Sequence, residues 1–282
     1  MGSRKVIVQG VEGCFHDAAA REFFCNEDIE TVACESFPLM MDMIKSDPSL
    51  TGIMAIENTI AGSLLQNHEL IHKGNLNITG EYKMRISHVL CALPGQRIET
   101  LTEVNSHPIA LMQCEEFLRR HPNLKMIEKF DTAGSAREIA ERNLEGHAAI
   151  CGDLAARLYG LEILEKGIET NKRNFTRFLI VQHPENGESL NNGVQPDKAS
   201  IVFSLPHTQG ALSKVLTILA FYDLNLTKIQ SFPIVGKEWE YKFYIDLTFD
   251  DTTRYRQAIE AARPLMSRLK ILGEYISCKK IL

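Results

Sequence analysis

The chain has 282 residues, 44% of them hydrophobic and 24% charged, with a net charge of -5. This is the composition of a globular protein long enough for two or three domains. The negative net charge, with no basic tract interleaved with aromatics, excludes nucleic acid as an expected partner. No apolar stretch approaches the ~18 residues of a transmembrane helix, so no membrane partner is expected.

The seven cysteines include no CxxC pair, and the N-terminus lacks the long apolar run of a signal peptide. An odd number of scattered thiols is typical of a reducing compartment. A cytoplasmic location is therefore expected.

Residues 1–182 alternate short apolar runs with amphipathic patterns. This alternation predicts an α/β domain with a mixed or mostly parallel sheet. Pro108 is expected in the first turn of a helix, where its missing N–H is harmless. Strand or strand-and-loop segments are expected at 5–10, 51–58, 87–95, 101–107 and 147–152, and helices at 15–24, 62–73, 108–121, 132–144 and 153–160.

A second unit follows a polar segment. Residues 183–198 are rich in Pro, Gly, Asn and Ser, so a linker is expected there. Residues 199–282 then show strands and helices in the order βαββαβ, which predicts a ferredoxin-like domain.

Arg177 stands out in the segment NFTRFLIV, residues 174–181. If this segment is extended, side chains alternate between two faces. Arg177 then shares one face with Phe175 and Leu179, while Thr176 shares the other with Phe178. A permanent cation in an apolar row needs a partner. That partner is either a carboxylate of a ligand or an acidic residue in a salt bridge.

Loops that follow strands and open helices are the expected binding positions, because ligands of open α/β sheets lie beyond the carboxyl ends of the strands. The free N–H groups at a helix start also attract anions. Ser106 and Thr132 are expected as helix N-caps. Any α/β domain needs such caps, but these loops together with Arg177 favour a small polyanionic ligand. The loops are residues 10–16, 57–63, 105–108 and 131–136.

Known motifs that the chain resembles only in part are rejected. Residues 10–13 lack the middle glycine of the dinucleotide motif GxGxxG. His68 and His72 match the zinc pattern HExxH, but Ile78 stands where an extended zinc motif needs a third histidine. Both histidines are interpreted as a partly buried helix face, and no metal is expected. Cys14 is interpreted as a small buried thiol, since no partner histidine can be assigned.

The ordered motifs of the whole chain resemble prephenate dehydratase followed by an ACT regulatory domain. The motifs are GVEGCFHDAA, AIENTIAGS, SHPIALMQC, DTAGSA, AAICGDLAARLYGL and NFTRF, then GALSKVL, NLTKIQSFP and WEYKFYID. The resemblance implies a two-lobed catalytic domain, like a periplasmic binding protein, over 1–182. The chain would cross between lobes near residue 80 and near residue 175. The regulatory domain would occupy 199–282.

The resemblance implies that prephenate loses its ring hydroxyl as water and a carboxylate as carbon dioxide, giving phenylpyruvate. No cofactor or metal is needed. Thr176 would assist the departing hydroxide, with Glu57 and Asn58 as the further catalytic residues. The implied substrate-binding residues are Arg177, Ser106, Gln113 and Phe178. For Arg177 a salt bridge, for Glu57 a solvated loop acid, and for Ser106 and Gln113 capping or core roles remain open.

The resemblance also implies feedback by L-phenylalanine, bound between the ACT domains of two subunits in a homodimer or homotetramer. The implied effector residues are Gly210, Ala211, Leu212, Ser213, Asn225 and Leu226. The family motif ESRP is QSFP here, residues 230–233. A domain that serves only dimerisation therefore stays open. Other departures from the family pattern are Ala55, Thr59, Ile109 and Thr170.

Three other functions stay open: arogenate dehydratase, a non-catalytic amino-acid sensor, and an exported solute-binding protein. The retained Thr176 and Arg177 argue against the sensor, and the missing signal peptide argues against the exported protein.

Overall fold

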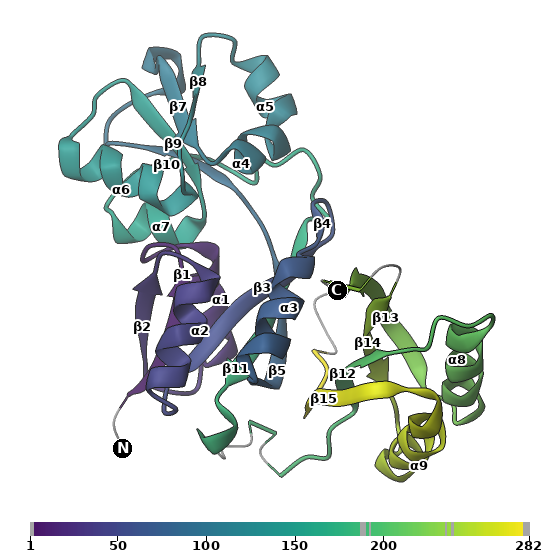
Figure 1. Cartoon of the computed structure of the whole chain (residues 1–282). Helices are drawn as coiled ribbons and strands as arrows, with labels where there is room; N and C mark the ends of the chain where they lie inside the picture. Colours follow the sequence, from purple (N-terminus) through teal and green to yellow (C-terminus); the bar gives the residue numbers. More distant parts are fainter. Residues whose placement is uncertain (1–2, 187–189, 192, 235, 238–239, 279–282) are drawn as a thin grey trace.

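The computed structural model describes residues 3–186, 190–191, 193–234, 236–237 and 240–278. The chain forms two α/β lobes and a C-terminal domain that lies beside the first of them (Figure 1). Across these described residues, no helix is long and apolar enough to cross a membrane.

The first lobe is a six-stranded sheet with the path β2-β1-β3-β11-β5 and a short β4 paired to β3. It is mixed, because β1 runs parallel to β2 and β3 while β11 runs antiparallel to both its neighbours. The elements are β1 Arg4–Gln9, α1 Phe15–Phe23, β2 Ile29–Cys34, α2 Phe37–Ser46, β3 Thr51–Asn58, β4 Gly62–Ser63, α3 Leu65–Gly74, β5 Asn77–Arg85 and β11 Phe175–Gln182.

The second lobe is a five-stranded mixed sheet with the order β10-β6-β9-β7-β8. The chain enters this lobe after β5 and returns to the first lobe at β11. Its elements are β6 Val89–Ala92, a 3₁₀ turn at Ile98–Thr100, β7 Glu103–Ser106, α4 Pro108–Gln113, α5 Glu115–Arg120, β8 Lys125–Glu128, α6 Thr132–Arg142, β9 His147–Cys151, α7 Asp153–Leu158 and β10 Glu162–Lys166.

Strand β11 is the central feature of the first lobe, since it lies between β3 and β5. Its side chains alternate as predicted. Phe178 and Ile180 belong to a core that also contains α1 and residues of the second lobe. Leu179 and Val181 belong to a core on the opposite face, together with α2, α3 and C-terminal residues such as Tyr244. The two faces of β11 therefore contact different parts of the molecule.

The C-terminal domain is a four-stranded antiparallel sheet with the order β13-β14-β12-β15. Helices α8 and α9 pack against this sheet and form a hydrophobic core with it. The mixed sheets of the lobes and the βαββαβ order here confirm the predicted fold class. The elements are β12 Lys198–Ser204, α8 Ala211–Phe221, β13 Asn225–Pro233, β14 Tyr241–Thr248, α9 Thr252–Ala262, a 3₁₀ turn at Arg263–Leu265, and β15 Ser267–Tyr275.

The helix expected over 108–121 is wrong as a single element. The structure has α4 and α5, which meet at Cys114, a residue with φ -104° and ψ 20°. This break lets Leu111 and Phe117 enter one core, where both are buried.

Candidate active site

A pocket of about 230 Å3 lies between the two lobes. We call it the inter-lobe pocket. Strands β3 and β11 and the start of α1 form one wall, and the starts of α4 and α6 belong to the other. It is lined by four of the residues expected from the sequence, which are Asn58, Gln113, Thr176 and Phe178. Thr176 and Phe178 reach it together because alternate residues of a strand share a face.

Asn58 and Thr176 are joined across the β3–β11 ladder, where they are register partners. The Asn58 amide Nδ2 donates to Thr176 Oγ1 at 2.9 Å and to Asn174 Oδ1 at 2.7 Å. The Asn58 Oδ1 accepts from the backbone N–H groups of Ile60 and Ala61. These two bonds fix which end of the amide faces Thr176. The Thr176 hydroxyl is thereby held as an acceptor toward Asn58, and its hydrogen is available for another oxygen.

The polar chain continues into the second lobe through Gln113. Its Oε1 accepts from Asn174 Nδ2 at 3.0 Å and lies 2.9 Å from His88 Nε2. Burial lowers the pKa of His88 below its usual value, so the ring is neutral near pH 7. The amide oxygen can only accept, so His88 carries its proton on Nε2. Gln113 therefore anchors the polar row from behind Asn174 as well as lining the pocket.

His16 is a further lining residue on the first-lobe wall. Burial lowers its pKa to about 4. The neutral ring accepts from the Ala55 N–H at Nε2, 3.3 Å away, so its proton is on Nδ1. The ring packs edge-on against Phe178, with ring centroids 5.2 Å apart. His16 and Phe178 thus form an aromatic wall beside the Thr176 hydroxyl.

The described lining of the inter-lobe pocket contains no lysine or arginine. Positive charge is supplied instead by the N-terminal ends of two helices, because Phe15 and Thr132 are the first residues of α1 and α6. Such ends favour anions. The pocket can therefore hold a ring against apolar walls, direct one hydroxyl donor at an oxygen, and receive carboxylates at helix starts.

Arg177 lies on the opposite face of β11 from this pocket. Its guanidinium donates to Glu81 Oε2 at 2.6 Å, Asp246 Oδ2 at 2.5 Å and Tyr275 Oη at 3.0 Å. Burial opposes its charge, but Asp246, Tyr275 and Glu81 outweigh burial and raise the pKa of Arg177 well above its usual value. The structure therefore places Arg177 in salt bridges, one of the two alternatives left open by the sequence.

Glu57 and Ser106 also lie away from the inter-lobe pocket. Glu57 pairs with Arg177 in the β3–β11 register and receives Lys228 Nζ at 2.9 Å from β13. Ser106 is fully buried and donates to the Ile150 carbonyl at 2.6 Å. It packs β7 against β9 rather than facing a ligand.

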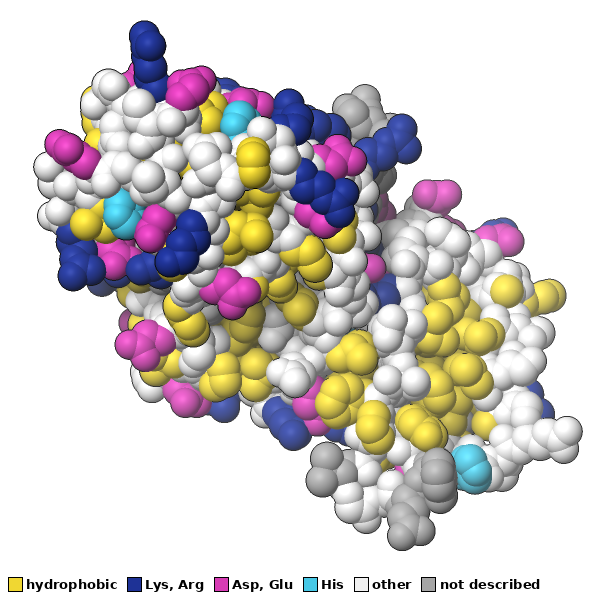
Figure 2. Space-filling view, turned by 90° about the horizontal axis from the view of Figure 1, so that it is seen from above, with side chains coloured by type: hydrophobic (Ala, Val, Ile, Leu, Met, Phe, Trp, Pro, Cys, Tyr) yellow, Lys and Arg dark blue, Asp and Glu magenta, His cyan; other side chains and the backbone are white. Residues whose placement is uncertain are grey.

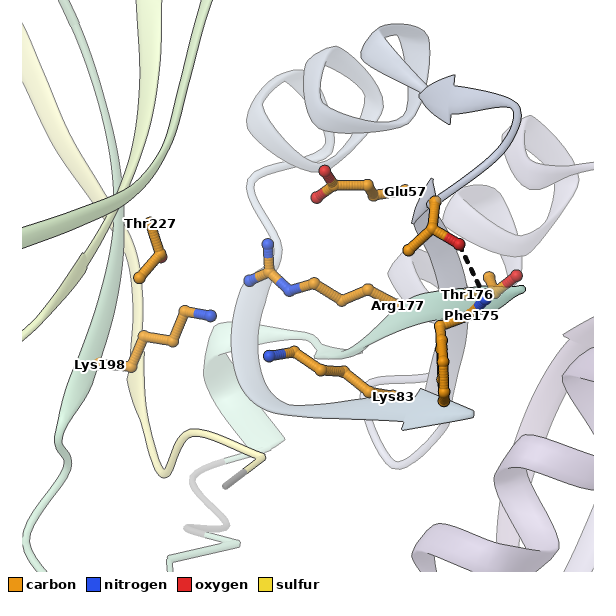
Figure 3. Close-up of a pocket in the computed structure, with 8 residues that line it drawn as sticks. Glu57, Lys83, Phe175, Thr176, Arg177, Lys198 and Thr227 are labelled. Atoms are coloured by element: carbon orange, nitrogen blue, oxygen red, sulfur yellow. Dashed lines mark hydrogen bonds between the residues drawn. The ribbon is translucent and has the colours of Figure 1, made fainter. Parts of the chain in front are cut away.

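A second pocket of about 350 Å3 lies between the first lobe and the C-terminal domain. Glu57, Lys83 and Arg177 extend from the lobe toward Lys198 and Thr227 (Figure 3). Thr176 lines this second pocket as well as the inter-lobe pocket. Of the other expected residues, Glu57 and Arg177 line only the second pocket, and Asn58, Gln113 and Phe178 line only the inter-lobe pocket.

The predicted helix caps are shifted by one residue. His107, not Ser106, is the N-cap of α4, and its Nδ1 accepts from the Ile109 N–H at 3.2 Å. Asp131, not Thr132, caps α6 by accepting from the Gly134 N–H at 2.6 Å. In both places the cap is the residue directly before the first helical residue, from which a side chain reaches the N–H of the second or third helical residue.

The rejected motifs have structural roles. His68 is buried and His72 partly buried, and both rings pack on Tyr244 of β14. The helix-face interpretation is therefore confirmed, and this face contacts the C-terminal domain. Cys14 is buried too, and burial raises the pKa of its thiol to about 12.

The expected effector residues lie at the two ends of α8. Gly210 is its N-cap in the left-handed region, with φ 75°, and Ala211, Leu212 and Ser213 form the first turn. Asn225 and Leu226 begin β13 after the helix has ended. Eight further residues of α8, 214–221, separate the groups, or about 12 Å at 1.5 Å per residue. A single chain does not bring them together.

The sequence interpretation missed His16, His88 and Asn174. Asn174 directly precedes β11, and alternation places it on the same face as Thr176. His16 lies in the loop over residues 10–16, one of the expected binding positions. His88 belongs to a crossing segment whose position depends on the fold of both lobes.

Comparisons with known proteins agree with this architecture. A family model described as prephenate dehydratase matches residues 6–186. A relative from Arabidopsis thaliana, named arogenate dehydratase/prephenate dehydratase 6, chloroplastic, is 35% identical over 287 residues. The aligned region covers 96% of this chain and 68% of the relative.

Two solved structures are similar over nearly the whole chain. One, described as GqqA, a novel type of quorum quenching acylases, has a TM-score of 0.87 at 27% identity and covers 98% of this chain and 99% of that chain. The other is a prephenate dehydratase from Arthrobacter aurescens in complex with L-Phe. Its TM-score is 0.85 at 27% identity, with 96% of this chain and 90% of that chain covered.

Proposed function

The chain belongs to the prephenate dehydratase family, and from that premise we propose that it converts prephenate into phenylpyruvate, water and carbon dioxide. The enzyme is a lyase that aromatises its substrate's ring. The observation that carries the proposal is the Asn58–Thr176 hydrogen bond at the inter-lobe pocket.

The Thr176 hydroxyl is proposed to donate to the ring oxygen as it departs. A donor directed at developing charge stabilises the transition state more than the ground state. Asn58 orients that hydroxyl, and Gln113 holds the same polar row through Asn174. Phe178 provides the apolar surface for the ring. The substrate's carboxylates would lie at helix starts, with no neighbouring cation in the described lining.

The remaining expected residues do not contact the substrate in this proposal, and they support the strands instead. Arg177 and Glu57 support β11 and β3 from the other face, and Ser106 fixes β7 to β9. To bind the substrate directly, Arg177 would have to break its salt bridges with Glu81 and Asp246. These two buried carboxylates would then lose one of the cations that compensate their charge.

Arogenate is the alternative substrate, supported by the name of the Arabidopsis relative. Incubation with prephenate should yield phenylpyruvate, followed by ultraviolet absorption, and arogenate should yield phenylalanine, followed by chromatography. The ratio of the two kcat/KM values decides the preference. Turnover of neither substrate would contradict the enzyme and favour a non-catalytic sensor.

Acyl transfer is the activity in the description of one similar structure. The lining gives it no support. Within its described residues there is no serine or cysteine, and Thr176 is bonded to an amide rather than to a base. A hydroxyl nucleophile needs a base within reach of its proton.

L-Phenylalanine is proposed as a feedback effector, supported by the similar structure that contains it. Gly210, Ala211, Leu212, Ser213, Asn225 and Leu226 are its proposed contacts. Since a helix separates the groups in one chain, the proposed site lies between two copies. Inhibition that strengthens with the fraction of dimer would support it, and an activity unchanged by added phenylalanine would contradict it.

A homodimer or homotetramer through the C-terminal domain is part of the proposal. Hydrophobic side chains gather on one face of this domain (Figure 2), and its exposed large apolar residues include Phe221, Ile229 and Ile271. Large apolar patches on a surface are typical of interfaces. Light scattering of the purified chain tests the oligomeric state.

The proposed domain division is a catalytic unit over 1–182, a linker over 183–198 and a regulatory ACT domain over 199–282. Residues 187–189 and 192 of that linker lie outside the described residues. A cytoplasmic location is also proposed. The Arabidopsis relative is named as chloroplastic, so cell fractionation is the direct test of the compartment.

A further inference from the structure

Buried charged side chains join the first lobe to the C-terminal domain. Arg177 of β11 and Glu81 of β5 come from the lobe, and Lys198 of β12, Asp246 of β14 and Tyr275 of β15 come from the C-terminal domain. We call these residues the interdomain clasp. None of them is more than 8% exposed. Figure 3 shows Arg177 of the clasp, which extends toward Lys198.

The clasp is satisfied on both sides. Lys198 Nζ donates to Glu81 Oε2 at 2.8 Å, the same oxygen that accepts from Arg177. Ser200 donates to Asp246 Oδ1 at 2.5 Å. Two cations therefore face two carboxylates. Burial would raise the pKa values of Glu81 and Asp246, but Arg177 and Lys198 outweigh it and lower them. Loss of one member would leave an uncompensated buried charge.

A second tie lies one strand away. Lys228 of β13 donates to Glu57 Oε2 at 2.9 Å and to Ser63 Oγ at 2.6 Å. Glu57 directly precedes Asn58, and Arg177 directly follows Thr176. Each member of the Asn58–Thr176 hydrogen bond thus has a chain neighbour that is held by the C-terminal domain.

The two tied residues are themselves register partners, Arg177 with Glu57, and the β3–β11 register shifts between Arg177 and Phe178. At such a shift the backbone hydrogen bonds between the two strands are locally disrupted, so they constrain the strands less than a regular ladder does. Side-chain ties at the irregular position therefore help to set how Asn58 meets Thr176.

We infer that Arg177 and Glu57 are positioning residues, through which the C-terminal domain holds Thr176 and Asn58 in their reactive arrangement. The inference rests on the proposed function for its kinetic readout. It assigns Arg177 to the interdomain clasp rather than to the substrate. A change in the C-terminal domain alone should then alter turnover at the inter-lobe pocket.

The test uses variants of the full chain in the C-terminal domain. Asp246→Asn and Lys228→Met each remove one tie, and Tyr275→Phe is a milder change if either fails to fold. The matched control is Lys242→Met. It breaks another interdomain pair, Lys242 Nζ with Glu69 Oε1 at 2.9 Å, which involves α3 and not β11 or the end of β3.

Asp246→Asn and Lys228→Met should lower kcat about tenfold to hundredfold with a much smaller change in KM, since small misplacements of reacting groups have effects of this size. Lys242→Met should keep kcat close to that of the wild type. Wild-type kcat in both test variants would overturn the inference. So would a raised KM in Arg177→Lys combined with wild-type kinetics in Asp246→Asn, because that result is expected of a substrate-gripping arginine.

Hydrogen exchange separates this inference from the proposed function. Asp246→Asn should speed amide exchange in residues 175–182, while Lys242→Met should not. If the wild type dehydrates neither substrate, the proposed function fails, and exchange still decides whether the clasp orders β11. Equal rates of amide exchange in residues 175–182 of both variants would overturn the inference that the clasp orders β11.

Discussion

The Asn58 amide donates a hydrogen bond to the Thr176 hydroxyl oxygen across the β3–β11 ladder, with Nδ2 and Oγ1 2.9 Å apart. The opposite end of the same amide is fixed by two backbone N–H groups. The direction of the bond is therefore set by the fold, and the Thr176 hydrogen remains available to a ligand in the inter-lobe pocket.

Thr176→Ala should lower kcat because the hydroxyl donor is lost while the fold is kept. Loss of one directed donor typically costs ~2.7–4 kcal/mol of barrier, or ~10²–10³ in rate. Turnover of prephenate and arogenate measures the effect. Thr176→Ser retains the hydroxyl and is the matched control, expected to remain far more active. Equal losses in both variants would show that the methyl group, and not the donor, matters.

Asn58→Asp should also impair turnover, for a different reason. The carboxylate still accepts from Ile60 and Ala61, so the loop keeps its bonds. The new oxygen can only accept, so the Thr176 hydroxyl must donate to it and is diverted from the substrate. We expect a fall in kcat, together with a lower melting temperature because the buried Asn174 Oδ1 loses its donor. Wild-type kcat would contradict the assigned direction of the bond.

The sequence could predict the alternation of β11, because period two is a local property of an extended chain. It could not predict what each face meets. Arg177 is separated from Glu81 by 96 positions and from Asp246 by 69. Their meeting depends on strand order and on how the C-terminal domain packs. Motif resemblance grouped Thr176, Asn58 and Gln113 with Glu57 and Arg177, although strand alternation already places Arg177 on the face opposite Thr176.

The cap at His107 shows a different kind of error. Pro108 occupies the first helical turn, and this alone favours the residue just before it as the cap. The frequency of serine at caps, in contrast, favours Ser106. The structure instead uses Ser106 inside the sheet of the second lobe, where it is fully buried. The hydrogen bond from Ser106 to the Ile150 carbonyl of β9 therefore determines the position of this serine, rather than the preference of serine for helix caps.

Gln113→Leu should destabilise the second-lobe wall. It removes the acceptor shared by Asn174 Nδ2 and His88 Nε2. Each buried group left without a partner costs ~1–3 kcal/mol. Urea unfolding should show a lower free energy of unfolding, together with reduced activity because Asn174 is freed. Gln113→Glu keeps an acceptor and is the control. An unchanged unfolding free energy in Gln113→Leu would contradict the polar row.

His68 should make stability fall as the pH falls below its usual pKa. Burial, followed by the charge of Lys228, lowers the pKa of His68 from 6.5 to about 4 in the folded protein. Between these values the unfolded chain binds a proton that the folded chain does not. The stabilising contribution is therefore complete above pH 6.5 and is lost progressively toward pH 4.

The slope from this one histidine approaches ~1.4 kcal/mol per pH unit in the free energy of unfolding. Urea unfolding between pH 5 and 7 measures it. His68→Gln should flatten the slope by about that amount, whereas His207→Gln, at an exposed position of the C-terminal domain, should leave it as in the wild type. An unchanged slope in His68→Gln would mean that the ring is protonated in the folded protein. The packing of α3 on Tyr244 would then have to accommodate a charge.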